Sequence, residues 1–428
     1  MTYAIMLGVF VILLFLGAPI ALSLGMSSLL AILYNGTGIN VIAGQIYGGI
    51  GKYLLLAVPF FVLSGNIMAK AGISDRLIAF IDALLGHLRG GIAMVCVVVA
   101  CFFGAISGSG AATVAALGVI LIPAMIEREK FSDPFAHGVV AAASSIAVII
   151  PPSISFVIYA SLTGVSVGDI FVAGILPGVI MGVAMIIVVQ IYAHKHHLKP
   201  AHPWKGWREV WRTFKSAFWG LLMPVIILGG IYSGLFTPTE AAAIAVFYGI
   251  IVSAFVYRNM GMKDFLHVLS ASASSTASIL FLVANAHIFS YLLSSEQIPQ
   301  KLAILMTSLT TNPTMIMFLI MIVLLIAGCF LDNAVAVILL TPIFVNVVQA
   351  MNIDICYFGV FLVFVLAIGQ VTPPVGLCLF VACDIGKVSI EKISREVLPY
   401  VGGLIVTAIL LVLFPRIVTW LPSLTKMA

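Results

Sequence analysis

Asp332 is the residue whose chemistry stands out first, because it lies inside an otherwise apolar stretch, residues 313–350. An ionised side chain inside a bilayer costs about 3 kcal/mol or more, so its presence there indicates a function. With Asn333 and Thr341 beside it, the carboxylate predicts a ligand for a cation or a support for the ligands. The structural alternative is a helix cap, since Asp accepts hydrogen bonds from the free N–H groups of a helix start.

A second polar run carries hydroxyls in place of a carboxylate. Ser107-Gly108-Ser109-Gly110 interrupts the apolar stretch 91–126, and Thr113 follows within one turn. Hydroxyl and carbonyl oxygens are hard ligands suited to a small cation, and glycine lets the backbone approach closely. Small residues also pack helices against each other, which is the structural alternative for this run.

Two double prolines break further apolar stretches. Pro151-Pro152 lies within residues 136–163 and Pro373-Pro374 within residues 355–383. Each pair removes two helix donors, so carbonyls are left without helical partners. Inside a membrane such backbone must be buried in protein or line a wet cavity. Segments 150–155 and 369–376 therefore offer carbonyls and hydroxyls opposite the two polar runs.

Composition identifies the medium that surrounds these residues. Of 428 residues, 62% are hydrophobic and 8% are charged, whereas soluble domains carry about a quarter charged residues. This excludes a soluble domain and predicts an all-α polytopic membrane protein. The stretches 91–126 and 313–350, interrupted near their middle, are expected to form re-entrant helical hairpins.

Positive charges predict how the chain is oriented. Ten apolar stretches are long enough to cross, although the first two are short, and the segment 194–215 carries six Lys and Arg residues. Placing this segment in the cytoplasm puts 16 of the 20 Lys and Arg residues on the inner side by alternation. Both termini are then predicted to be external.

The chain repeats its own pattern at an offset of 222 residues. Pro151-Pro152 matches Pro373-Pro374, and Leu176-Pro177 matches Leu398-Pro399. Five crossings per half make the repeat an inverted one, which is typical of secondary transporters. The predicted parts are a first repeat, 1–193, with an arm helix 74–88, hairpin 91–126 and broken helix 136–163; a basic cytoplasmic linker, 194–215; and a second repeat, 216–428, with an arm helix 299–309, hairpin 313–350 and broken helix 355–383.

Four motifs together resemble the large (M) membrane subunit of tripartite ATP-independent periplasmic (TRAP) transporters, of the DctM and SiaM type. They are residues 104–118, 150–153, 236–243 and 371–376, and the resemblance covers essentially the whole chain. It implies an elevator-type transporter, not an enzyme, in the bacterial inner membrane. The expected function is import of a carboxylate-containing solute driven by two or more Na⁺ ions. Sialic acid and C4-dicarboxylates are the substrate classes, with overall likeness leaning toward sialic acid.

The resemblance also assigns site residues and partners. One sodium site is expected at Ser107 and Ser109 with backbone of Ile149 and Pro152, the other at Asp332 and Asn333 with Gly369, Thr372 and Gly376. Substrate is expected near Ser107, Thr113, Ser153 and Ser155. The implied partners are a periplasmic substrate-binding protein (P) and a small four-helix membrane subunit (Q), expected as a separate chain; nucleic acid is not expected.

The residues leave two other functions to consider, a membrane-embedded hydrolase and a passive channel. A membrane-embedded hydrolase would use Ser107 or Ser109 as nucleophile and needs a base, but His137 and His287 lie in no second polar motif. A passive channel would carry current without substrate or binding protein. Glu240 is not expected to bind a cation, because Thr237-Pro238-Thr239-Glu240 has the spacing of a helix capping box.

Overall fold

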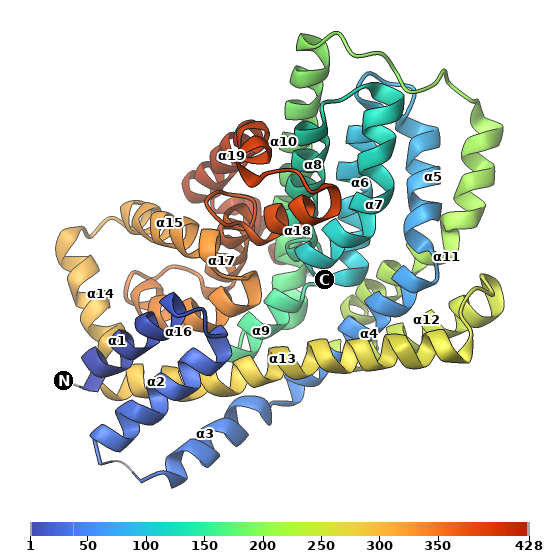
Figure 1. Ribbon diagram of the computed structural model, residues 1–428. Helices are drawn as coiled ribbons and strands as arrows, with labels where there is room; N and C mark the ends of the chain where they lie inside the picture. Colours follow the sequence, from blue (N-terminus) through green and yellow to red (C-terminus); the bar gives the residue numbers. More distant parts are fainter. Residues whose placement is uncertain (1, 37, 426–428) are drawn as a thin grey trace.

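The computed structural model describes residues 2–36 and 38–425, and within them every regular element is a helix (Figure 1). Nine helices in this part of the chain are long and apolar enough to cross a membrane. The all-α polytopic class predicted from the composition is confirmed.

The first elements form a group of short helices followed by an arm. They are α1 Thr2–Phe15, α2 Ile20–Tyr34, α3 Asn40–Ile50, the 3-10 turn η1 Tyr53–Leu56, α4 Ala57–Lys70 and α5 Ile73–Leu85. Gly72, with φ of +72°, separates α4 from the arm helix α5. In α5 the buried residues Ile73, Leu77 and Ile81 recur every fourth position, so one stripe faces the protein.

The first hairpin and the first broken helix come next. Their elements are α6 Gly91–Ser107, α7 Gly110–Glu129, α8 Asp133–Ser144, the 3-10 turn η2 Ser145–Val148 and α9 Ile154–Thr163. Residues 149–153, with the double proline, separate α8 and η2 from α9. The chain then returns through α10 Val167–Lys195.

The helix α11, Trp207–Tyr232, begins inside the predicted linker 194–215. Only residues 196–206 of that linker lie outside helices. The earlier start follows from aromatic residues at helical spacing, since Trp211 stacks on Phe214 with ring centroids 5.4 Å apart. The sequence prediction used charge alone and overlooked this pattern.

The second half repeats the order of the first, with an arm, a hairpin, a broken helix and a long return helix. Its elements are α12 Pro238–Ile251, the π-helix η3 Val252–Val256, α13 Met262–Ser295, α14 Ile298–Leu309, α15 Pro313–Phe330, α16 Asn333–Ala350, α17 Ile355–Gly369, α18 Leu377–Gly386, α19 Ile390–Leu413 and α20 Arg416–Thr425. The repeated fold with two hairpins and two broken helices is thereby confirmed.

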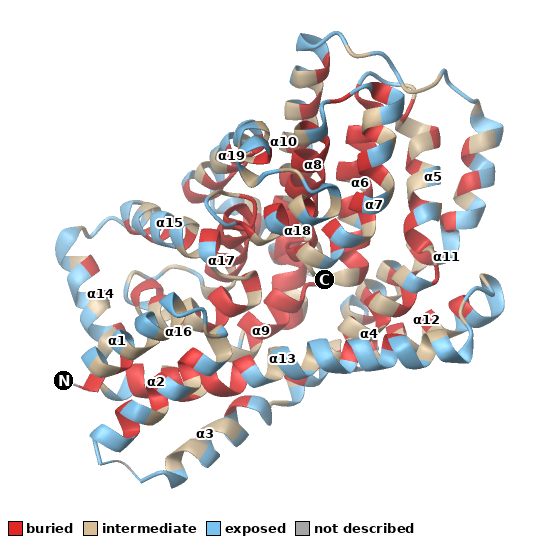
Figure 2. Ribbon diagram, in the orientation of Figure 1, coloured by how far each residue is buried: buried red, intermediate tan, exposed pale blue. Residues whose placement is uncertain are grey.

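Burial is concentrated in the hairpins and broken helices (Figure 2). All residues of α17 from Tyr357 to Gly369 are buried, and α17 packs against α15, α16 and α9 as well as α10 and α19. By contrast, α13 runs along one edge of the molecule and exposes much of its surface. The core therefore lies where parts from the two halves meet.

Candidate functional site

The tip of the first hairpin is a hydrogen-bonded network of hydroxyl groups around Gly108. The φ of Gly108 is +61°, which glycine adopts readily. Thr113 Oγ1 donates to the Ser109 carbonyl oxygen at 2.8 Å and lies 3.0 Å from Ser107 Oγ. Either hydroxyl can donate in this second contact, and Ser107 Oγ also lies within 3.4 Å of the Ser109 carbonyl oxygen. Ser109 Oγ accepts from Ala112 N at 3.5 Å and caps α7.

The first broken helix meets this tip at Pro152. A methyl group at Gly108 would come within 3.3 Å of the Pro152 carbonyl oxygen, so that oxygen faces the hairpin turn. Ser153 bridges the break, since its Oγ donates to Val148 O at 2.6 Å and accepts from Phe156 N at 3.4 Å. The hydroxyl therefore caps α9.

Two further predicted residues of this segment are buried. Ser155, in the first turn of α9, is 3% exposed. The carbonyl oxygen of Ile149 is directed at α10, where a methyl group at Gly174 would lie 2.9 Å from it. The structure thus brings Pro152 O to the first tip, whereas Ile149 O faces a neighbouring helix.

The tip of the second hairpin carries the carboxylate of Asp332. Its Oδ2 accepts from Ala334 N at 3.0 Å, so the capping geometry left open by the sequence is present. Its Oδ1 accepts from Gln370 Nε2 at 3.2 Å. Both carboxylate oxygens thus accept hydrogen bonds from the protein, and their negative charge is what would attract a cation.

Asn333 stands next to this carboxylate and is 2% exposed. Its Nδ2 donates to Val363 O at 3.4 Å, but its Oδ1 is buried without a hydrogen-bond partner. A buried oxygen of this kind is costly unless something pairs with it. Together with Asp332, it fits a small hard cation, which takes carboxylate and amide oxygens as ligands.

The second break is held by backbone bonds. Gly376 N donates to Cys329 O at 2.9 Å and ties the segment to α15, while Gly369 packs directly against Gly328. Thr372 N donates to Gly369 O at 3.0 Å, and Thr372 Oγ1 donates to Ile368 O at 2.7 Å. These bonds occupy one lone pair of the Gly369 carbonyl oxygen and the hydroxyl proton of Thr372.

Gln370 connects the two units and was not among the predicted ligands. It is 1% exposed, it reaches Asp332, and a methyl group at Gly110 would lie 3.0 Å from its Oε1. The same methyl would lie 2.9 Å from Cys378 Sγ and 3.3 Å from Ser144 O. The start of α7 is therefore in contact with the second break. One signal in the sequence could have identified Gln370, because it is the only amide side chain in residues 355–383.

The remaining polar residues behave differently. Thr237 and Glu240 form the predicted capping box, with Glu240 Oε2 accepting from Thr237 N at 2.8 Å. Among the described residues, the hydrogen-bond partners of Ser107 and Ser109 do not include histidine. A hydrolytic Ser–His pair is thus not formed at the first tip.

The fold and site define a polytopic helical membrane protein with two broken-helix units that meet at polar tips. Residues 7–417 match the family described as tripartite ATP-independent periplasmic transporter, DctM component. The chain belongs to this family of transporter permeases.

Similar proteins are named for several different solutes. The chain is 41% identical to the C4-dicarboxylate TRAP transporter large permease protein DctM of Pseudomonas aeruginosa, over 94% of each chain. It is 37% identical to the sialic acid TRAP transporter large permease protein SiaM of Vibrio cholerae, over 96% of each. It is 38% identical to the isethionate TRAP transporter permease protein DctMQ of Oleidesulfovibrio alaskensis, over 96% of this chain and 65% of that one.

A solved structure shares the fold. The YdaH transporter of Alcanivorax borkumensis matches with a TM-score of 0.66 over 90% of this chain and 89% of its own. The two chains are 15% identical, so this likeness concerns the fold alone.

Proposed function

We propose that the protein is the large membrane subunit of a sodium-coupled importer of carboxylate-containing solutes. The observation that carries this proposal is the meeting of the two units, where Gln370 reaches Asp332 and lies beside Gly110 at the start of α7. This contact joins the charged tip of one half to the hydroxyl tip of the other. Ions bound at the two tips would therefore stabilise the same arrangement of the site.

Sodium at the second tip is supported by charge and by unused oxygens. Asp332 supplies the negative charge, Asn333 Oδ1 lacks a partner, and both lie at the start of α16. A positive helix start is an unfavourable neighbour for a cation, so the carboxylate is needed to reverse the local potential. At the first tip, Ser107 and the Pro152 carbonyl are the neutral counterparts. Two or more Na⁺ ions are the proposed coupling ions.

The substrate carboxylate is proposed to bind between the tips. The N-terminus of α9 lies near Gly108, and the N-terminus of α7 lies near Cys378 in the first turn of α18. Three helix starts thus gather there, and their free N–H groups and dipoles favour a negative group. Ser153 and Thr113 border this region. C4-dicarboxylates and sialic acid, named for two of the relatives, carry carboxylate groups, which supports this class.

The proposed mechanism is of the elevator type. In it α6–α9 and α15–α18 move as one unit, while α1–α4 and α11–α13 form the scaffold. The hairpins and broken helices pack on each other across the two halves, for example α7 on α18 and α16 on α9. Moving the unit whole keeps each freed carbonyl paired, whereas opening it would expose these groups. The halves 1–193 and 216–428 would exchange roles between the two states.

The proposed partners are a Q subunit as a separate chain and a periplasmic binding protein. This chain spans 65% of the relative named DctMQ, and that name supports an association between the M subunit and a Q subunit. The proposed location is the bacterial inner membrane with both termini periplasmic. In that orientation the basic residues of the 194–206 segment and Trp207 lie at the cytoplasmic surface.

Uptake in proteoliposomes tests coupling and substrate together. Vesicles with the purified protein, a Q subunit, a candidate binding protein and labelled acids are compared with and without an inward sodium gradient. We expect sodium-driven accumulation that depends on the binding protein. Current or equilibration without binding protein or sodium would instead identify a passive channel.

Cross-linking tests the moving unit. Thr163 on α9 and Ser290 on α13 line one cavity between the proposed unit and the scaffold. Cysteines at these positions, joined by a short bifunctional reagent, are expected to stop transport while sodium binding persists. Full transport in the joined protein would contradict the elevator and favour gates that move around a fixed site.

A further inference from the structure

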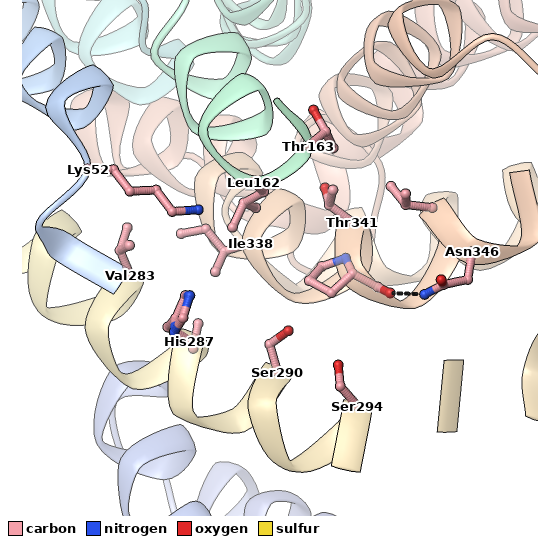
Figure 3. Close-up of a pocket in the computed structure, with 13 residues that line it drawn as sticks. Lys52, Leu162, Thr163, Val283, His287, Ser290, Ser294, Ile338, Thr341 and Asn346 are labelled. Atoms are coloured by element: carbon pink, nitrogen blue, oxygen red, sulfur yellow. Dashed lines mark hydrogen bonds between the residues drawn. The ribbon is translucent and has the colours of Figure 1, made fainter. Parts of the chain in front are cut away.

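A polar cavity lies between α13, α16 and the end of α9 (Figure 3). Its volume is about 230 Å³. Of the polar residues predicted to lie at the two hairpin tips, only Thr341 lines this cavity. Lys52, just before η1, extends its ammonium group toward the middle of the cavity. The walls come from the proposed scaffold on one side and from the proposed moving unit on the other.

The charge of Lys52 has no acidic partner in this cavity. Its Nζ donates to the carbonyl oxygen of Ser161 at 2.6 Å. Among the thirteen described residues that line the space, Lys52 is accompanied by His287 and by no Asp or Glu. Lys52 is partly buried, and this burial lowers the pKa of its ammonium group from the ordinary value, because a less hydrated charge is disfavoured. An anion in the cavity would offset that cost.

Two further polar atoms are buried here without a partner. Thr341 Oγ1, on a residue 1% exposed, has no hydrogen bond, and neither has His287 Nδ1. The Ser290 hydroxyl lies on the same wall as His287 (Figure 3). An ammonium and a hydroxyl both donate, so Lys52 and Thr341 together form a set of donors beside the His287 ring. Such a set matches a carboxylate, which only accepts.

We propose that this cavity binds a carboxylate group of a small four-carbon dicarboxylic acid, at a station apart from the hairpin tips. The proposal rests on the importer function and adds a second binding step to it. The volume supports a small acid, because about 230 Å³ lies below the roughly 300–1,000 Å³ of pockets for drug-sized ligands.

Binding at this station would also affect the contact between scaffold and moving unit. The bond from Lys52 to Ser161 joins the segment before η1 to α9. A carboxylate is a stronger acceptor for an ammonium than a peptide carbonyl is. A bound acid would therefore compete with the Ser161 carbonyl for the Lys52 ammonium and weaken this contact between scaffold and moving unit.

Calorimetry on the purified protein in lipid nanodiscs tests the station. Succinate is titrated in sodium-free buffer, where binding at the sodium-dependent tips is suppressed, and sialic acid and chloride serve as comparison anions. We expect saturable succinate binding that Lys52→Met weakens about tenfold or more, since a charge-assisted hydrogen bond is lost. Lys52→Arg should retain most of it, and Thr341→Val should weaken it less than Lys52→Met does.

Lys301 offers the matched control. It is exposed, and its Nζ donates to a backbone carbonyl, Glu296 O, at 3.0 Å, but it does not line the cavity. Lys301→Met should leave succinate binding unchanged. Equal binding by wild type and a monodisperse Lys52→Met protein would overturn the proposal. So would the absence of sodium-free binding, or displacement of succinate by equimolar chloride.

One further variant separates this proposal from the proposed function. Asp332→Asn removes the charge at the second tip, outside the cavity lining. Sodium-free succinate binding should persist in it while sodium-driven uptake is lost. If sodium-driven uptake is wild-type in Asp332→Asn, the coupling role fails but the station stands. If binding in sodium-free buffer is lost along with uptake, the station is not independent of the tips and the inference fails.

Discussion

The two units built from a hairpin and a broken helix follow one backbone plan but differ in charge and burial. Around the first break Pro151 and Pro152 are buried, whereas at the second Pro374 is exposed and Val375 is 39% exposed. The helix after the first hairpin turn is capped by Ser109, and the one after the second by Asp332. The repeated backbone thus places oxygen atoms at equivalent positions in both units. It does not determine whether those oxygens carry a charge.

This difference assigns the units distinct parts in ion binding. A carboxylate attracts a cation through net charge, while hydroxyls and carbonyls contribute only dipoles. The charged, partly exposed second unit is therefore the one on which sodium binding depends most. The first unit, neutral and enclosed, is expected to refine binding once the second is occupied.

The largest effect is expected at Asp332. Asp332→Asn should reduce sodium-driven uptake about 100-fold, because truncating a buried charge partner costs roughly 2–5 kcal/mol. Asn caps helices about as well as Asp, so this variant removes the charge and keeps the cap. Asp332→Ala should lose uptake to the same degree and about 1 kcal/mol of stability besides. Uptake as a function of sodium and thermal unfolding measure the two quantities.

Asp354 provides the control for this prediction. Its Oδ1 accepts from Tyr357 N at 2.6 Å and caps α17, away from the tips. Asp354→Asn should transport normally. Wild-type sodium response in Asp332→Asn would show that Asp332 is a cap alone and that the charge difference between the units has no role in coupling.

The next effect concerns the bridge between the units. Gln370→Met keeps the length of the side chain but loses the bond to Asp332. The sodium concentration for half-maximal uptake should rise about tenfold, since a hydrogen bond to a charged group contributes roughly 1.5–3 kcal/mol. Gln349, exposed near the end of α16, gives the control Gln349→Met. Equal sodium dependence in both variants would mean that the units do not communicate through Gln370.

A smaller effect is expected in the neutral unit. Thr113→Val removes the bonds to Ser107 and Ser109 without changing shape, and sodium affinity should fall about threefold to fivefold, as expected for roughly 1 kcal/mol. Thr407→Val, which removes a buried bond to Leu404 O on α19, is the control. A loss in Thr113→Val as large as that in Asp332→Asn would reverse the ranking of the two units.

The smallest effect belongs to a carboxylate outside both units. Glu240→Ala breaks the capping box with Thr237 and should lower the melting temperature only slightly. Sodium dependence of uptake should stay within about twofold of wild type, as is usual for surface substitutions away from a site. A marked change in sodium dependence would place Glu240 in the coupling path and remove the distinction between capping and coordinating acids.

Much of the architecture was predictable because it is local. Apolar length marks crossing helices, Gly108 and Asp332 mark the two turns, and the double prolines mark the two breaks, since each acts on the backbone within a few residues. The capping box at Thr237 and Glu240 was predictable for the same reason. The start of α11 was not, because charge masked the aromatic pattern at Trp207 and Trp211.

By itself, the sequence determined the membrane class, the repeat, the two hairpins and the two breaks, because periodicity, hydropathy and proline act within one segment. Only the tertiary structure decided that Gln370 links Asp332 to the start of α7, that Ile149 O faces α10, and that Lys52 meets Ser161 across 109 positions of the chain. These contacts join segments far apart in sequence, and their partners follow from how helices pack. The type of a side chain limits the interactions that it can make, while helix packing determines which partner groups lie within its reach.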